Sequence, residues 1–167
     1  YKSIDELDLA PDVIFIAVKP QILADIKDDL AKIVTKDNIV ISILAGTDTQ
    51  KISEITGPQS KVARVMPNMA ALTGNSTSSC YFNENLTTDD KSFALSLFES
   101  FGICEVLSDE EDMHISTLIN GGAIAYFALI MKYLKKASLK HTKDLTEAQI
   151  NLFTTLWLTW MSLQQMS

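Results

Sequence analysis

The sequence predicts an α/β fold, in which a parallel sheet covered by helices precedes an all-helical C-terminal segment. Two observations support this prediction. In residues 1–66, three short and largely apolar runs alternate with two segments of helical periodicity, an order that is typical of a parallel sheet. From residue 108 onwards, apolar residues recur at helical spacing. We therefore expect two domains, at residues 1–107 and 108–167.

The first three strands are expected at residues 12–18, 38–42 and 61–66. Each is rich in β-branched residues, as is typical of a strand buried on both faces of a parallel sheet. Short connections of this kind predict right-handed crossovers. The carboxyl ends of all three strands would then meet at one edge of the sheet.

Two helices are expected between these strands. The first starts at Pro20, because the N–H that proline lacks would have no intrahelical partner at that position, and its apolar stripe ends at Ile33. The second starts at Thr47, since Thr47 and Gln50 match a capping box, and it ends before Gly57.

Further strands are expected at residues 76–82 and 102–107, on either side of an amphipathic helix at residues 88–101. A second capping box, Ser108-Asp-Glu-Glu111, predicts the start of a long apolar helical segment. The weak point of that segment is the pair Gly121-Gly122, because glycine inside a helix costs about 1 kcal/mol relative to alanine.

A last helix is expected at residues 146–166, and it is apolar around much of its girth. Such a helix exposes a large apolar patch unless a partner covers it. We therefore expect a homodimer or a higher oligomer that forms through the C-terminal helices. The sequence assigns no role to Trp157 and Trp160.

Composition excludes several classes of function. The net charge is −7 and Lys and Arg do not cluster, which argues against binding to nucleic acid or to an anionic membrane. Cys80 and Cys104 are interpreted as small buried side chains in a reducing compartment, and no metal site is expected. We see no signal peptide, and the apolar stretches at 123–131 and 152–163 are shorter than the roughly 20 residues of a membrane span. A soluble cytoplasmic protein is expected.

Candidate binding residues follow the three parallel strands, at the edge where open α/β sheets bind ligands. They form the junctions Ala-Val-Lys-Pro at 17–20, Ser-Ile-Leu-Ala-Gly at 42–46 and Met-Pro-Asn at 66–68. Small residues in these loops would let a flat ring approach the backbone, and helix N-termini would add N–H donors. Each junction alone is also explained as a strand end or a turn, but their order and spacing together favour a site.

Five short motifs stand in order along the chain. They are Ala-Val-Lys-Pro-Gln at 17–21, Ser-x-x-Ala-Gly at 42–46, Arg-Val-Met-Pro-Asn at 64–68, Ala-Leu-x-Gly at 71–74 and Ala-Tyr-Phe at 125–127. Together they resemble the pyrroline-5-carboxylate reductase family over about residues 5–150. The resemblance implies reduction of the cyclic imine 1-pyrroline-5-carboxylate to L-proline, with NADPH or NADH, in proline biosynthesis.

The resemblance also implies a domain organisation and a set of site residues. Residues 1–107 would be the C-terminal part of a Rossmann-type dinucleotide-binding domain, and residues 108–167 a truncated helical dimerisation and substrate domain. The positions on the cofactor side would be Ala17, Val18, Lys19, Pro20, Leu44, Ala45 and Asn68. Those on the substrate side would be Asn120, Gly121 and Gly122.

The chemistry of this reaction needs few side chains. A hydride moves to an imine carbon that is already electrophilic once the nitrogen is protonated, so the protein must mainly hold and orient the reactants. Backbone N–H groups at a broken helix suit the substrate carboxylate. Thr117 is the candidate catalytic hydroxyl near the imine nitrogen, and the alternative is a threonine that only packs.

The chain departs from the family at both ends. The family begins with a strand and a G-x-G-x-x-(small) loop that binds the cofactor pyrophosphate, and residues 1–10 contain neither. The Ser-Gly-Ser-Gly-Pro-Ala-Tyr motif of the family stands here as Asn-Gly-Gly-Ala-Ile-Ala-Tyr at 120–126, and its Ser-Pro-Gly-Gly-Thr element has no counterpart. We therefore expect this chain alone to bind NADPH poorly and to be inactive.

Two alternatives stay open. One is another oxidoreductase of the 6-phosphogluconate-dehydrogenase-like superfamily, whose members usually place a lysine on the first long interdomain helix. Residues 113–131 contain no lysine, which favours the imine reductase. The other is a non-catalytic paralogue or interaction module that pairs with an intact subunit.

Overall fold

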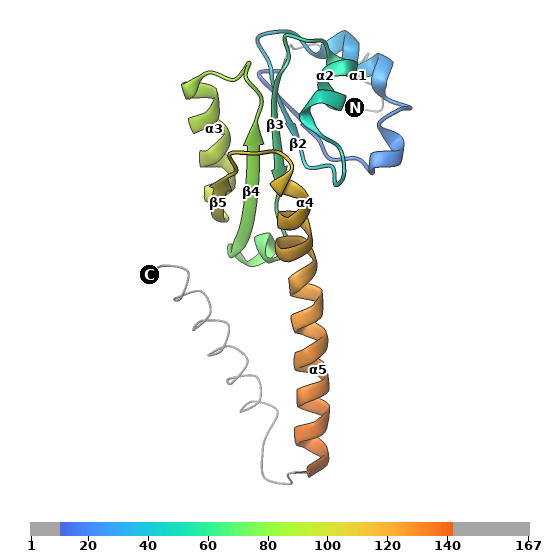
Figure 1. Ribbon diagram of the computed structural model, residues 1–167, viewed down its shortest axis with the longest axis vertical. Coiled ribbons are helices and arrows are strands. Elements are labelled where there is room, and N and C mark those ends of the chain that lie inside the picture. Colours follow the sequence, from blue (N-terminus) through green and yellow to red (C-terminus); the bar gives the residue numbers. More distant parts are fainter. Residues whose placement is uncertain (1–10, 142–167) are drawn as a thin grey trace. The chain divides into compact units, whose positions relative to one another are not determined.

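The computed structural model describes residues 11–141 (Figure 1). The chain divides into two compact units, the first ending at Gly122 and the second beginning at Ala123. The strands all belong to the first unit. The helix expected at residues 146–166 lies outside the described residues, and so do Trp157 and Trp160.

The strands of the first unit form one sheet in the order β1-β2-β3-β4-β5. The first three strands are parallel to one another, as predicted, whereas β4 runs antiparallel to β3 and parallel to β5. The α/β fold with a partial Rossmann-type sheet is confirmed, with one antiparallel pair added. The strands are Val13–Ile16 (β1), Ile39–Ser42 (β2), Lys61–Met66 (β3), Ser76–Phe82 (β4) and Gly102–Val106 (β5).

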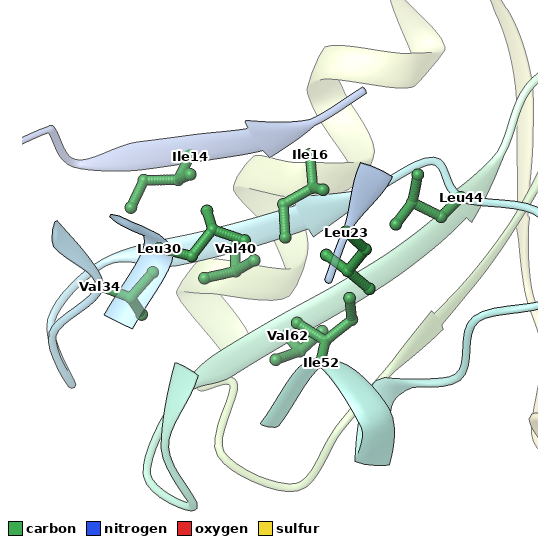
Figure 2. Close-up of a cluster of buried hydrophobic side chains, with 9 residues drawn as sticks. All are labelled: Ile14, Ile16, Leu23, Leu30, Val34, Val40, Leu44, Ile52 and Val62. Atoms are coloured by element: carbon green, nitrogen blue, oxygen red, sulfur yellow. The ribbon is translucent and has the colours of Figure 1, made fainter. Parts of the chain in front are cut away.

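Helices α1 (Lys27–Ile33) and α2 (Thr49–Thr56) cover one face of this sheet. Only aliphatic side chains are buried in the cluster beneath them (Figure 2). Burial of such apolar surface is the main source of stability for this part of the fold. The cluster consists of Ile14, Ile16, Leu23, Leu30, Val34, Val40, Leu44, Ile52 and Val62.

The helix expected to run without a break from Pro20 to Ile33 is interrupted. A 3-10 helix at Pro20–Ile22 is followed by turns, and α1 begins only at Lys27. The turns bury Leu23, whereas its neighbour Ile22 is 41% exposed. Core packing of Leu23 therefore replaces the regular helical stripe that the spacing predicted.

The predicted cap of α2 is wrong by one residue. Asp48, not Thr47, is the N-cap, and its Oδ1 accepts a hydrogen bond from the Lys51 N–H at 2.7 Å. A carboxylate at this position also interacts favourably with the positive end of the helix dipole. Thr47 is buried instead.

Helix α3 (Thr88–Glu99) covers the opposite face of the sheet. Its buried residues are Ala94 and Phe98, whereas Phe93 of the predicted stripe is 45% exposed. The cluster on this face includes aromatic and cysteine side chains. Its buried members are Ile39, Ile41, Ala63, Val65, Cys80, Leu86, Ala94 and Phe98.

A glycine allows the last two strands to pair closely. A Cβ atom added at Gly102 would lie only 2.0 Å from the Ser76 carbonyl oxygen. No side chain fits in that space, so β5 can begin beside β4 only with glycine at this position.

The long apolar segment after β5 consists of three helical pieces. They are α4 (Asp112–Ser116), a π-helix at Thr117–Gly122 and α5 (Ala123–His141). The second predicted capping box is wrong, because α4 begins at Asp112 and has no side-chain cap. The predicted weak point at the glycine pair is the end of the π-helix, a wider turn that often occurs at functional sites.

Candidate functional site at the carboxyl ends of the parallel strands

The carboxyl ends of β1, β2 and β3 lie at the same edge of the sheet. Ile16, Ser42 and Arg64 are aligned across the three strands. The loops that follow therefore leave the sheet on the same side, at the edge where open α/β sheets bind ligands. This arrangement was predicted from the sequence, and the strand register confirms it.

The loop after β1 is accessible along its whole length. Ala17, Val18, Lys19 and Pro20 are all exposed. Lys19 has an extended backbone, with φ −69° and ψ 145°, and it leads into the 3-10 helix that begins at Pro20. Both the backbone and the side chains of this loop are therefore available to a ligand.

The loop after β2 combines a buried side chain with an open backbone. Leu44 is 1% exposed and belongs to the core on the α1–α2 face, so only its backbone can face a ligand. Ala45 is exposed. At Gly46, φ is 67° and an added Cβ would meet nothing within 4 Å. This loop therefore has room for a flat ring or a ribose close to its backbone.

Asn68, after β3, supports the local backbone. Its side-chain Oδ1 accepts a hydrogen bond from the Ala70 N–H at 3.0 Å and caps the 3-10 helix at Met69–Thr73. Its own N–H donates to Ser76 Oγ at 3.3 Å. Because Oδ1 has this local role, the Nδ2 amide group is the part of Asn68 that remains for a ligand.

Thr117, the candidate catalytic hydroxyl, is bonded within its own helix. Its Oγ1 donates to the Met113 carbonyl oxygen at 2.7 Å. This is the usual bond of a threonine to the preceding turn of a helix. To donate a proton elsewhere, the Thr117 side chain must rotate away from Met113.

Asn120 faces the sheet with its side chain. Its Nδ2 donates to Ser79 Oγ at 3.0 Å and to Ser116 Oγ at 3.1 Å, and Ser116 Oγ donates to Ser79 Oγ at 2.5 Å. These bonds tie the π-helix to β4. Gly121 is exposed, with nothing within 4 Å of an added Cβ, and Gly122 is half-buried.

Three polar residues close to this edge were not among the site residues expected from the sequence: Arg64, Glu110 and Ser79. Arg64 is buried, and its Nη1 lies 3.1 Å from Glu110 Oε1. A charged residue inside a predicted buried strand was the available signal, since such a charge is rarely buried without a partner. The partner itself could not be found, because it is 46 residues away along the chain.

A groove of about 520 Å³ runs beside α2 and the turn between β4 and α3. It contains none of the predicted site residues. Two of its amide side chains are already occupied, because Asn83 bonds to Val62 and Ser60 and Asn85 bonds to Pro58 and Ser60. The groove is therefore not part of the candidate site.

Cys80 and Cys104 are free thiols, the first buried and the second half-buried. Contact with Cys104, and then burial, raises the pKa of the Cys80 thiol, which therefore stays neutral. Both pack in the cluster on the α3 face, but burial, which the sequence predicted for both, is complete only for Cys80. Within residues 11–141, no three His, Cys, Asp or Glu side chains are grouped so that they could hold a metal ion.

One helical stretch among the described residues, Asp112–Leu134, is long and apolar enough to cross a membrane, with a mean hydropathy of 1.4. The uninterrupted apolar stretch within it, at 123–131, is shorter than a membrane span. Length and composition are weak indicators, because core helices of soluble proteins meet the same test.

No protein-family model matches the chain. The pyrroline-5-carboxylate reductase of Haemophilus influenzae is 32% identical to it over 133 residues, which are 80% of this chain and 49% of that protein. The chain thus spans about half the length of the curated relatives it matches.

Two solved structures differ in how similar they are to this chain, in fold and in sequence. A Plasmodium falciparum pyrroline carboxylate reductase with NADP bound has a TM-score of 0.87 and 30% identity, covering 100% of this chain and 63% of its own. An Aquifex aeolicus prephenate dehydrogenase reaches only 0.54 at 14% identity, covering 86% of this chain and 55% of its own, and this likeness shows the fold alone. Together with the motifs at the strand ends, these relatives establish that the chain belongs to the pyrroline-5-carboxylate reductase family.

Proposed function

We propose that the protein containing this chain reduces 1-pyrroline-5-carboxylate to L-proline with NADPH or NADH, in proline biosynthesis. The observation that carries the proposal is the register of β1, β2 and β3, whose accessible loops leave the sheet at one edge. In this reading, the chain supplies the nicotinamide side of the cofactor domain and the helical segment that faces the substrate.

The loops after β1 and β2 hold the cofactor in this proposal. The exposed stretch from Ala17 to Pro20 and the open backbone at Ala45 and Gly46 fit the approach of a flat ring and a ribose. Leu44 contributes its backbone, and Asn68 contributes its amide group. The bound nicotinamide supplies the hydride, and these residues hold its ring beside the substrate.

The π-helix holds the substrate in this proposal. Because the Asn120 side chain is bonded to Ser79 and Ser116, substrate contact from residues 120–122 is made by backbone N–H groups. Such groups suit the carboxylate of the substrate. Thr117 acts as the hydroxyl beside the imine nitrogen after it rotates away from Met113. The alternative, in which Thr117 only packs, matches the hydrogen bond present in the structure.

The test is an assay of pyrroline-5-carboxylate-dependent oxidation of NADPH and of NADH, with the full-length protein that carries this chain. We expect turnover with at least one cofactor. Absence of substrate-dependent oxidation with both, in protein that remains folded, would refute the proposal. In this proposal the 167-residue chain alone binds NADPH poorly and is inactive, so turnover by it at an enzymatic rate would contradict that part.

A pair of matched variants tests the cofactor surface. Ala45→Phe fills the space beside the open backbone, and we expect the KM for the cofactor to rise by about tenfold or more, since tenfold corresponds to 1.4 kcal/mol of binding. Ala31→Phe is the control, because Ala31 is an exposed alanine on α1, away from the strand ends. If both substitutions changed the KM for the cofactor equally, the proposal that the cofactor binds at this edge would be wrong.

A second function, as a non-catalytic module that pairs with an intact reductase subunit, is favoured by the exposed apolar side chains of α5. These include Tyr126, Leu129, Ile130, Tyr133 and Leu134. The same face supports a homodimer or a higher oligomer through the C-terminal helices, and we place the protein in the cytoplasm. Co-purification with an intact reductase, without activity of its own, would identify the module.

A further inference from the structure

The first observation is a buried cation with one counter-ion. Arg64 is 1% exposed, and its Nη1 donates to Glu110 Oε1. Its Nε and Nη2 atoms are buried and form no hydrogen bond within residues 11–141. A buried charge is costly unless it is paired and bonded. Arg64 therefore depends on Glu110 to a degree that a surface arginine would not.

The second observation is that Glu110 joins three elements. Its Oε1 accepts hydrogen bonds from Arg64 Nη1 at 3.1 Å and from the Thr49 N–H at 2.8 Å. Its Oε2 accepts one from Thr49 Oγ1 at 2.7 Å. The Thr49 N–H is one of the donors at the start of α2 that have no intrahelical partner. Glu110 thus links β3 and the first turn of α2 to the segment that precedes α4.

The third observation concerns how the helical segment Asp112–Gly122 is held. Met113 is its one buried side chain, whereas Ile115, Leu118 and Ile119 are all more than half exposed. Apolar burial therefore contributes little to its position in this unit. Polar bonds flank it instead, with Glu110 before its first residue and the Ser79–Ser116–Asn120 bonds near its end.

From these contacts we propose that Arg64 is a positioning residue, which acts through Glu110 to hold the segment Asp112–Gly122 against the sheet. Arg64 is itself enclosed, so it acts on this segment and not on a ligand. The consequence for catalysis rests on the proposed function, because the segment carries Thr117 and the backbone of residues 120–122. Loss of the pair would leave the fold in place and shift these groups relative to the strand ends.

Hydrogen exchange of the 167-residue chain tests the proposal without any need for activity. Glu110→Gln keeps a side-chain acceptor for the Thr49 N–H and removes the charge opposite Arg64. We expect the amides of residues 112–122 to exchange about tenfold faster, while those of α3 change little, because local opening is governed by local contacts. Glu111→Gln is the matched control, because Glu111 is the exposed neighbour, and it should leave both rates unchanged.

A double substitution separates positioning from general loss of stability. Arg64→Met with Glu110→Gln removes both charges, and its effect on exchange should be smaller than the product of the two single effects, because the residues act as a pair. If Arg64→Met alone does not fold, the exchange rates of Glu110→Gln and of the double variant test the proposal instead. Unchanged exchange in residues 112–122, or an equal increase in α3, would overturn the proposal.

The catalytic consequence has its own readout in the full-length protein. Glu110→Gln should lower kcat about tenfold and leave the KM for the cofactor within about twofold, because only the substrate-facing segment moves. An unchanged kcat, or an equal change in both constants, would contradict the catalytic role. If the unsubstituted protein does not reduce pyrroline-5-carboxylate, the proposed function fails, and the exchange result still decides the role of Arg64.

Discussion

On the α3 side of the sheet, the residues of β2 and β3 near the candidate site are apolar, whereas on the α2 side each of these strands carries a buried polar residue there. Alternating residues of a strand face opposite sides of a sheet. On the α3 side the sequence runs Ile39, Ile41 and Ala63, Val65; on the α2 side it runs Val40, Ser42 and Val62, Arg64, Met66.

The two sides of the sheet have different roles: one stabilises the sheet, and the other fixes the position of the segment that follows β5. Apolar side chains on the α3 face stabilise the sheet without fixing any one contact, because the hydrophobic effect has no direction. The buried polar groups on the α2 side have defined partners, such as Glu110 for Arg64 and Ser116 for Ser79. Such groups add little net stability, but they require one arrangement of the segment that follows β5. The polar side is therefore where we expect function.

The largest effect is expected on the apolar side. Phe98→Ala removes a side chain that is 4% exposed and that contacts the rings of Phe15 and Phe101. It should lower the free energy of unfolding by about 3–5 kcal/mol, the usual cost of deleting a buried phenylalanine. Urea denaturation of the chain measures this cost.

The control for that experiment is Phe93→Ala, on the same helix but 45% exposed. It should cost much less, because its side chain already contacts water. If Phe93→Ala costs as much as Phe98→Ala, then burial does not explain the stability of the α3 face.

A smaller loss is expected on the polar side. Ser79→Ala removes the acceptor of hydrogen bonds from Ser116 and Asn120, and it should cost about 1–2 kcal/mol, because two half-buried donors lose their partner. The double variant Ser79→Ala with Ser116→Ala should cost less than the sum of the single changes. Additive costs, measured by the same denaturation method, would show that these residues do not form one network.

The smallest effect is expected at the solvent-facing start of α3, and it depends on pH. Burial disfavours ionisation of Asp90, but hydrogen bonds from Thr87 and the ion pair with Lys61, at 2.9 Å, outweigh it and lower the pKa of Asp90. A lowered pKa in the folded state stabilises the protein above the pKa of the unfolded state, near 3.9, and this stabilisation is lost as the pH falls through the folded pKa.

Asp90→Asn should therefore cost about 1 kcal/mol at neutral pH, as for loss of a helix cap, and nothing at a pH below the folded pKa. Asp89→Asn is the control, because Asp89 lies in the same turn and is exposed. The free energy of unfolding of each variant is measured by urea denaturation across the acid range. A cost of Asp90→Asn that does not change with pH would contradict the assignment of its pKa shift.

Local patterns predicted most of the first unit correctly. The strands at 61–66 and 76–82 were predicted to the residue, because β-branched and apolar runs bounded by Gly, Pro and Asn are local signals. The capping residue of α2 was predicted wrongly, since two adjacent residues, Thr47 and Asp48, both suit that position. Burial of Thr47 in the folded protein selected Asp48.

The candidate site was predictable in part. The junctions at 17–20 and 42–46 were found, because the direction of parallel strands places their ends at one edge. The orientation of Asn120 toward Ser79 and the bond of Thr117 to Met113 were not found. Both contacts depend on the hydrogen-bonding pattern of the helix at Thr117–Gly122, which is a π-helix. The spacing of residues in the sequence did not predict that pattern.

The sequence by itself determined the order of the strands and helices and the parallel direction of the first three strands. It also determined which loops a ligand can approach. These follow from the period of apolar residues and from the preferences of single residues for turns and caps. Only the tertiary structure decided that β4 runs antiparallel to β3 and that Arg64 meets Glu110. Such pairings join residues that are far apart in the chain. They form because an unpaired buried charge or an unpaired strand edge is unfavourable in the packed interior.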